Sequence, residues 1–214
     1  PKPSSAASDV YKRQDMNNDN VNDIIISGYD SSRFGIFLDI IKGNSDGSLS
    51  TLFESNIITF PDSIAQDVGG IGNIDLVDVN RDGMMDLYLN GSATSKLYIN
   101  SGGILNLSNN WLPQVNLSYS SGKWGDSNMD GAPDLFLMGV NEFTNQIINE
   151  LYLNNGFTLE IDPNTIFPSL INGSNAWGDY DNDGDQDLII CGRIADKTAS
   201  ITPVSYTHLR AHET

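Results

Sequence analysis

The stretch WGDYDNDGDQDLIICG, residues 177–192, places five aspartates at alternate positions and then continues directly into apolar residues. Carboxylates this close to one another repel, so a chain that buries the following segment needs something to compensate their charge. The same spacing occurs three more times, beginning at Asp15, Asp78 and Asp126, and the successive copies start 63, 48 and 53 residues apart. A unit repeated at about this period is typical of stacked repeats or propeller blades.

The four copies, here called loops 1 to 4 (15–23, 78–86, 126–134 and 179–187), share one pattern. Each has Asp or Asn at positions 1, 3 and 5 and Asp at position 9, and a glycine closes each copy five residues later. Position 6 is glycine in three loops and Asn20 in loop 1. Glycine adopts a positive φ readily and asparagine tolerates it better than most residues, so we expect a sharp turn there.

Both ends of the sequence resemble translated sequencing adaptors. Residues 4–14, SSAASDVYKRQ, correspond to a translation of the adaptor used in transposase-based sequencing libraries, and residues 204–214, VSYTHLRAHET, to a translation of the opposite adaptor. Such segments are excluded from reasoning about the fold. We therefore expect 1–14 to be a non-native leader, 15–203 to contain the repeats, and 204–214 to be a non-native tail, with the natural sequence cut mid-gene at both ends.

The remaining sequence is strongly acidic. Taking the four basic and two acidic residues of the two ends from totals of 11 and 28 leaves 7 and 26, a net charge of −19, and 14 of these acidic residues lie in the four loops. Such a surface repels nucleic-acid phosphates and anionic membranes, and no apolar run reaches the length of a membrane span. We therefore expect no nucleic-acid partner and no membrane insertion. Both histidines, His208 and His212, fall in the expected tail.

Short apolar runs around the loops predict strands. A run such as LFLM (135–138) follows each loop and suits a strand buried on both faces. A third segment, a Gly- or Asn-rich turn and a fourth segment come next, as in KLYIN (96–100), SGG (101–103) and ILNLS (104–108). Four antiparallel strands in a unit of about 55 residues describe a propeller blade. The sequence therefore predicts an all-β fold, a partial β-propeller of about three to four four-stranded blades, each with an Asp-rich hairpin loop that binds calcium, with exposed blade faces at its ends.

The loops have the donors for a hard cation. Oxygen atoms from side chains at positions 1, 3, 5 and 9 and from the backbone carbonyl at position 7 can converge on one point, and calcium takes about six to eight oxygen ligands. The EF-hand shares these positions but needs Glu at position 12 and a following helix, whereas the residues here are Ile26, Leu89, Leu137 and Ile190. The alternative is a set of Asx turns with exposed acids. Four copies in register favour the metal.

The loops, the D-L-x-L strands and the L-Y-x-N-x-G segments resemble the FG-GAP or VCBS repeats of integrin-α-like propellers over nearly all of 15–203. The F-G-G-A-P signature is absent, which favours the VCBS-like branch, common in large secreted microbial proteins. In that family the loop joins the first two strands of a blade and holds calcium. The resemblance implies up to four Ca²⁺ ions with side-chain ligands Asp15, Asn17, Asp19 and Asp23; Asp78, Asn80, Asp82 and Asp86; Asp126, Asn128, Asp130 and Asp134; and Asp179, Asp181, Asp183 and Asp187, and with carbonyl ligands Val21, Met84, Ala132 and Asp185.

We expect a non-catalytic module of a larger secreted or cell-surface protein that binds an extracellular protein or a glycan, because 15–203 contains neither histidine nor a nucleophile elbow. The alternative is the propeller part of a secreted polysaccharide-degrading enzyme, since some hydrolases and lyases resemble this fold. An uncommitted Asp/Glu pair or a Lys–Tyr pair converging on one face would favour that alternative. The remaining charged residues are scattered and read as surface charges: Lys42, Lys96, Lys123, Glu142, Glu150 and Glu160.

Trp124 and Trp177 each stand two residues before a loop, and this equivalence predicts packing between blades rather than a sugar-stacking role. For Trp111 both roles stay open. Cys191 lies in an apolar run, so we expect a small buried hydrophobe rather than a reactive thiol.

Overall fold

The computed structural model describes residues 10–30, 35–51, 71–91, 95–113, 115–194 and 201–206, and within these ranges it contains strands, turns and loops but no helix. This confirms the predicted all-β class. The strands are β1 (Val10–Gln14), β2 (Asp23–Asp30), β3 (Gly35–Gly43), β4 (Leu49–Thr51), β5 (Ile71–Val77), β6 (Asp86–Gly91), β7 (Ser95–Asn100), β8 (Leu105–Ser108), β9 (Leu117–Gly125), β10 (Asp134–Asn141), β11 (Ile147–Asn154), β12 (Leu159–Ile161), β13 (Leu170–Gly178), β14 (Asp187–Ile194) and β15 (Ile201–Tyr206).

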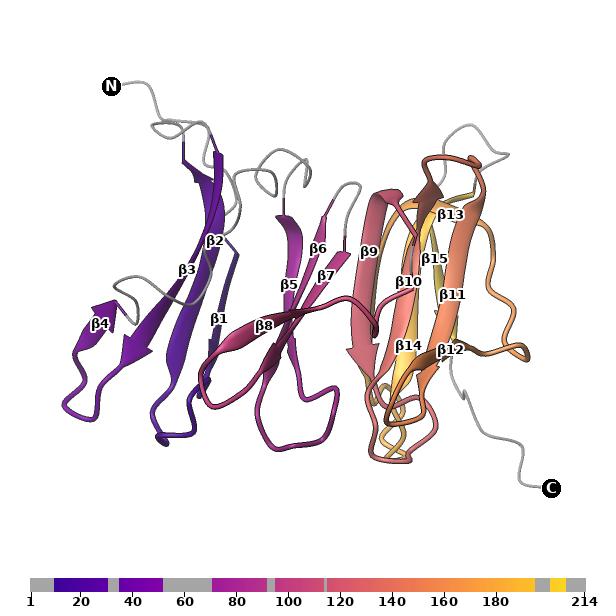
Figure 1. The fold of residues 1–214 in the computed structure, drawn as a ribbon. Coiled ribbons are helices and arrows are strands. Elements are labelled where there is room, and N and C mark those ends of the chain that lie inside the picture. The colour runs from indigo at the N-terminus through magenta and orange to yellow at the C-terminus, as the bar shows by residue number, and fades with distance from the viewer. Residues whose placement is uncertain are drawn as a thin grey trace.

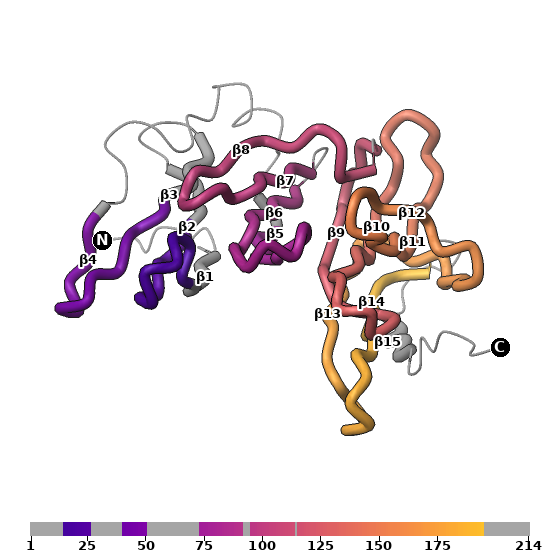
Figure 2. The backbone as a smooth tube through the Cα atoms, turned by 60° about the horizontal axis from the view of Figure 1, so that its bottom comes forward, coloured from indigo at the N-terminus to yellow at the C-terminus, as the bar shows by residue number. Residues whose placement is uncertain are grey.

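These strands form four antiparallel sheets in chain order, β1–β4, β5–β8, β9–β12 and β13–β15, each with consecutive strands as neighbours (Figure 1). The first strands of neighbouring sheets contact one another: β1 contacts β5, β5 contacts β9, and β9 contacts β13. The sheets follow one another in an open succession (Figure 2). Among the described residues, this arrangement is consistent with a β-propeller-like fragment, and no closed ring is formed.

A hydrophobic cluster fills each of the three interfaces between neighbouring sheets. Ile25 and Leu87 are fully buried between the first two sheets, and Tyr88 and Leu135 between the second and third. Phe136 belongs to the cluster shared with the last sheet. Burial of one such side chain stabilises a fold by about 1.5–3 kcal/mol, so these interfaces hold the sheets face to face.

The second strand of each sheet is buried on both faces only where a sheet packs against each side. All six residues of β6 are buried, as are the first six of β10. In β14, which belongs to the last sheet, Ile189 is 41% exposed. Cys191 on the same strand is only half-buried, with its thiol 3.5 Å from the Ser174 carbonyl oxygen. The prediction of a buried cysteine is therefore wrong, because it assumed a covering sheet.

The tryptophans pack between sheets, as predicted for Trp124 and Trp177. The Trp124 ring meets the Tyr88 ring edge to face at 5.6 Å. Trp177 donates from Nε1 to the Lys123 carbonyl oxygen at 3.2 Å and covers Gly125, where an added Cβ would lie 2.4 Å from its ring. Trp111 is partly buried and packs against the cluster of the second and third sheets.

A register shift in the first strand accounts for the closing glycine of the third and fourth sheets, Gly139 and Gly192. The pairing of β9 with β10 shifts between Met138 and Val140, which leaves Gly139 opposite the bulge. A Cβ on Gly139 would lie 2.9 Å from the Leu117 Cβ, and one on Gly192 would lie 3.0 Å from the Leu170 Cβ. Both contacts are too close for a larger residue, so the repeated glycine allows the bulged strand to approach.

Two strands include residues of the expected non-native ends. All of β1 belongs to the expected leader, and Val204–Tyr206 of β15 to the expected tail. The open edge of a sheet offers backbone hydrogen bonds to any extended segment, so this pairing does not depend on the origin of the residues. The boundaries at 14/15 and 203/204 stay a prediction. In the first repeat the fourth segment of this pattern is SLSTLF (48–53). Leu49–Thr51 of it form β4, and residues 52 and 53 lie outside the described ranges. The described part also holds no helix that could cross a membrane.

Candidate metal-binding loops

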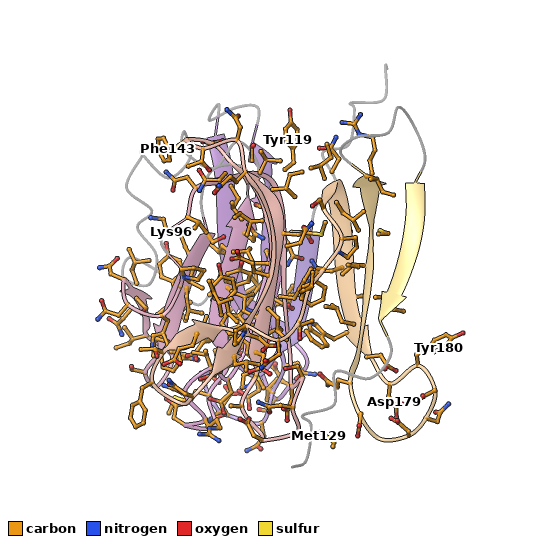
Figure 3. All side chains as sticks on the ribbon, turned by 90° about the vertical axis from the view of Figure 1, so that its right-hand side faces the viewer. Lys96, Tyr119, Met129, Phe143, Asp179 and Tyr180 are labelled. Carbon is orange, nitrogen blue, oxygen red and sulfur yellow. The ribbon has the colours of Figure 1, made fainter. Side chains whose placement is uncertain are left out.

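Each of the four loops connects the first and second strands of its sheet, as the sequence predicts. In Figure 3, Met129 of loop 3 and Asp179 of loop 4 lie at one end of the sheets, and Tyr119 and Phe143 lie at the other. The four acidic segments are therefore gathered at one end of the molecule.

Two positions of every loop have left-handed backbone. The first is position 6, which confirms the expected turn at Asn20 (φ 65°), Gly83 (87°), Gly131 (81°) and Gly184 (94°). The second is position 4, with Asn18 (58°), Arg81 (58°), Met129 (59°) and Asn182 (60°). Neither Arg81 nor Met129 favours this conformation, which costs roughly 1 kcal/mol for a residue with a Cβ. Sequence reasoning missed position 4 because Arg81 and Met129 carry no turn signal, so the four copies share no turn-forming residue type there.

Backbone amides orient the carboxylates at positions 1 and 5. In loop 2, Asp78 accepts from the N–H groups of Asp82 at 3.0 Å and Gly83 at 2.8 Å, and Asp82 accepts from Met84 N–H at 2.8 Å. The Asn80 side-chain oxygen also accepts from Asp82 N–H, at 3.1 Å. The same bonds recur in the other three loops, with lengths between 2.7 and 3.2 Å. Positions 1, 3 and 5 thus line the inside of one tight turn.

The position-9 aspartates, Asp23, Asp86, Asp134 and Asp187, are buried, with at most 1% of their surface exposed. Each accepts at Oδ2 from the backbone N–H of position 2, at 2.8 to 3.0 Å. In the first three sheets, Oδ1 accepts from the last residue of the third strand: Gly43 at 3.0 Å, Asn100 at 2.8 Å and Asn154 at 2.8 Å. The position-9 aspartate therefore connects the loop to the strand that follows it, a role that its prediction as a metal ligand did not include.

Asn100 and Asn154 connect neighbouring loops, and sequence reasoning missed them. The Asn154 amide donates to the carbonyl oxygen of Pro133 in its own loop at 3.1 Å and to that of Val79 in the preceding loop at 2.9 Å. Asn100 donates in the same way to Met85 at 3.0 Å and Met16 at 2.7 Å. The signal was present in the L-Y-x-N-x-G segments, whose asparagine ends the third strand.

The position-9 aspartates and these asparagines form one buried hydrogen-bonded path through three sheets. From the first sheet to the third, the path runs Asp23, Met16, Asn100, Asp86, Val79, Asn154, Asp134 and Ser127. None of these residues is more than 7% exposed. Hydrogen bonds are stronger in such a low-dielectric environment, and losing one partner leaves the other without compensation.

Burial also raises the pKa of carboxyls in the path when no cation is bound. Desolvation first, and then the nearby charges of Asp82 and Asp78, raise the pKa of Asp86 to about 6, against the bonds from Asn100 and Val79 that lower it. Desolvation likewise raises the pKa of Asp134. A cation at the loop would favour the charged carboxylates and oppose this shift.

The donor set fits a hard divalent cation. In loop 4, Asp179, Asp181 and Asp187 each place a carboxylate oxygen within 4.8 Å of the others. Asp183 lies in the same turn and accepts from Asp185 N–H at 3.0 Å. Carboxylate, amide and carbonyl oxygens without imidazole or thiolate suit calcium or magnesium rather than a softer metal. The backbone N–H of each predicted carbonyl ligand bonds to position 5, which places Val21, Met84, Ala132 and Asp185 in the turn; their coordination stays a prediction.

Loop 1 contains a basic group that was not predicted to be near it. The Lys42 ammonium lies 2.8 Å from Asp19 Oδ2. Its hydrogen bond lowers the pKa of Asp19, and the same contact raises the pKa of Lys42. Lys42 belongs to β3, so only the strand register brings it to the loop.

Several of the charged residues considered for catalysis have structural partners. Lys123 donates to Asn73 Oδ1 at 2.8 Å and lies 3.5 Å from Asp75 Oδ2, which links the second and third sheets. Glu150 accepts from the Tyr152 hydroxyl at 2.5 Å. Glu160 accepts from Asn155 Nδ2 at 2.9 Å. These contacts favour structural roles for the three residues.

Comparison with known proteins identifies one repeat directly. The family model described as FG-GAP-like repeat matches residues 78–137, which begin at the first aspartate of loop 2 and end within β10, so this segment is an FG-GAP-like repeat. No curated protein matches the chain. Among solved structures, a chain titled as an Agrocybe aegerita lectin that recognises non-reducing terminal N-acetylglucosamine is similar, with a TM-score of 0.47 and 14% identity. The match covers 92% of this chain and 66% of that one, so this chain spans less than two thirds of the lectin's length.

Proposed function

We propose that this chain, whose residues 78–137 are an FG-GAP-like repeat, is a calcium-stabilised, non-catalytic binding module of a larger secreted or cell-surface protein. The observation that carries the proposal is the repetition of one turn, with the same carboxylate-to-amide bonds, in all four loops. Chance acidic hairpins have no reason to share a buried aspartate at position 9. A shared site for a cation accounts for both features.

In a loop that takes calcium, the proposed ligands are those at positions 1, 3, 5, 7 and 9. Bound calcium supplies positive charge that offsets the repulsion among these carboxylates. Because Asp86 and Asp134 also hold the ends of β7 and β11, order in the loop is transmitted to two strands of each sheet. Calcium then stabilises the face-to-face packing of the sheets, and the chain serves as a rigid scaffold.

Thermal unfolding of the full chain in calcium and in excess chelator tests this function. We expect a higher melting temperature in calcium, because a ligand that binds only the folded state stabilises it by mass action. Asp86→Asn should remove part of the calcium effect. Glu142→Gln, in the exposed turn between β10 and β11, removes one negative charge away from the loops and should leave the effect intact. Equal melting temperatures in calcium and chelator would defeat the proposal.

The ligand-binding end is proposed to be the one opposite the loops. Tyr119 and Phe143 lie there, 68% and 79% exposed (Figure 3). Phe143 is held in place because the Asn141 side-chain oxygen accepts from its N–H at 3.0 Å and from Thr144 N–H at 3.1 Å. Exposed aromatic rings on a rigid turn supply large contact area to a glycan or a protein.

Glycan-array and extracellular-protein binding screens of the full chain test this choice. Phe143→Ala and Tyr119→Ala should each weaken any ligand that is found by at least tenfold. Phe157→Ala is the matched control, because Phe157 is 84% exposed but lies in the turn after Asn154, at the loop end. A ligand that loses affinity only with Phe157→Ala would place binding at the loop end instead.

A further inference from the structure

Loop 1 differs from loops 2 and 3 in the residue that the third strand presents beside it. In the second and third sheets, Tyr98 pairs with Leu87 and Tyr152 with Leu135, and the next residues along the chain are Ile99 and Leu153. In the first sheet, Ile41 pairs with Ile24, so the matching next residue is Lys42. The strand register therefore gives loop 1 a basic side chain where the two following sheets have an aliphatic one.

The side chains at this register position behave differently. Ile99 packs against the cluster between the second and third sheets, and Leu153 against the cluster between the third and fourth. Lys42 instead directs its ammonium to Asp19 Oδ2 at 2.8 Å, and both side chains are 31% exposed. Asp19 is position 5 of loop 1, which is one of the predicted calcium ligands. The Lys42 ammonium therefore lies beside the Asp19 carboxylate, which calcium would need as a ligand.

A second substitution follows directly after Lys42. The position that is Asn100 and Asn154 in the next two sheets is Gly43 in the first, since all three donate their N–H to the position-9 aspartate. A Cβ on Gly43 would lie 2.2 Å from the Asn22 carbonyl oxygen, so asparagine does not fit there. Loop 1 therefore lacks the side-chain amide that supports the position-8 carbonyl of loops 2 and 3.

From these differences we propose that Lys42 is the resident cation of loop 1, and that loop 1 takes no calcium at concentrations that fill loops 2, 3 and 4. This inference rests on the proposed calcium function of the other loops. A divalent ion entering loop 1 either displaces the ammonium from Asp19 or stays beside a like charge, and both lower its affinity. The chain then binds three calcium ions rather than four, and loop 1 keeps its turn without metal.

The proposal is tested by counting bound calcium on the full chain with isothermal titration calorimetry and equilibrium dialysis. Wild type should bind three ions, and Lys42→Met should bind a fourth. Lys42→Arg keeps the positive charge and should still give three. Lys96→Met is the matched control, because Figure 3 places Lys96 away from the end that carries Met129 and Asp179, so it should also give three.

A second pair of variants keeps the test independent of how well Lys42→Met folds. Asp19→Asn in loop 1 should leave the count at three, whereas Asp82→Asn, at the same position of loop 2, should lower it to two. Four ions in wild type with no change in Lys42→Met, or loss of an ion in Asp19→Asn, would overturn the proposal for loop 1 while leaving the calcium function in place. Absence of binding in every variant would overturn both.

Discussion

Loops 2 and 4 have the same turn but are held in different ways. Loop 2 has three aspartates, and its position-9 residue, Asp86, belongs to a buried hydrogen-bonded path that reaches the first and third sheets. Loop 4 has five aspartates, and three of their carboxylates lie within 4.8 Å of one another. Loop 2 therefore gains part of its order from this path, whereas loop 4 concentrates negative charge that a bound cation would offset. The number of acidic residues is thus a poor measure of how firmly a loop is held.

Breaking the buried path should have the largest effect and should not depend on calcium. Asn154→Leu keeps the approximate volume but leaves the carbonyl oxygens of Val79 and Pro133 buried without their donor. We expect a loss of about 2–4 kcal/mol in the free energy of unfolding, because each unpaired group costs about 1–3 kcal/mol.

Urea unfolding in calcium and in chelator measures this loss, which should be similar in both. Asn155→Ala is the control, since its side-chain bonds stay within the exposed turn, to Phe157, Thr158 and Glu160. It should cost about 0.5 kcal/mol or less, as surface substitutions do. Similar losses for the two variants would show that the path does not carry the stability assigned to it.

Loop 4 should respond in the opposite way. Asp183→Ala removes one predicted ligand, so in calcium the protein should lose the stabilisation supplied by one site, about 2.7 kcal/mol when free calcium is a hundredfold above the dissociation constant. In chelator the same change should be neutral or slightly stabilising, since one repelling charge is gone. The other sites should keep binding, which calorimetric titration checks. A loss of the same size in chelator would mean that loop 4 is held by its hydrogen bonds, like loop 2.

The smallest effect concerns pH. The pKa of Asp86 is raised from 3.8 to about 6, so the protonated carboxyl is favoured in the metal-free fold. The stabilisation that the metal-free fold gains from protonated Asp86 is fully present below about pH 4 and is lost as the pH rises through about 6. The free energy of unfolding should therefore fall by about 1 kcal/mol between about pH 5 and pH 7.5.

Calcium requires the charged carboxylate and should reverse this trend, so that affinity falls as the pH drops through about 6. Urea unfolding at a series of pH values, in chelator and in calcium, measures both slopes, and Asp86→Asn should flatten the metal-free one. Parallel slopes in the two conditions would contradict the placement of Asp86 at a metal site.

The sequence predicted the features that repeat at the level of residue type. The spacing of Asp and Gly identified the four loops, and the apolar runs identified the strands between them. The turn at Asn20 and the packing of Trp124 and Trp177 followed from equivalence between copies, without any structural information.

Other features depend on which residues meet across strands, and the sequence does not show this. Lys42 reaches Asp19 only through the pairing of β3 with β2. Asn154 bonds to Val79 in the preceding sheet, a contact between residues far apart in the chain. The exposure of Ile189 and Cys191 depends on whether a sheet covers β14, which no local pattern records.

Hydrogen exchange of individual amides in the full chain, with calcium and with chelator, tests the calcium sites most directly. We expect calcium to slow exchange of the loop amides of Asp82, Gly83 and Met84 and of the Asn100 amide, because Asp86 joins loop 2 to the end of β7. Amides in the middle of β10 should change less, since they are protected by the sheet alone. Equal exchange of the loop amides in both conditions would show that these loops are not calcium sites.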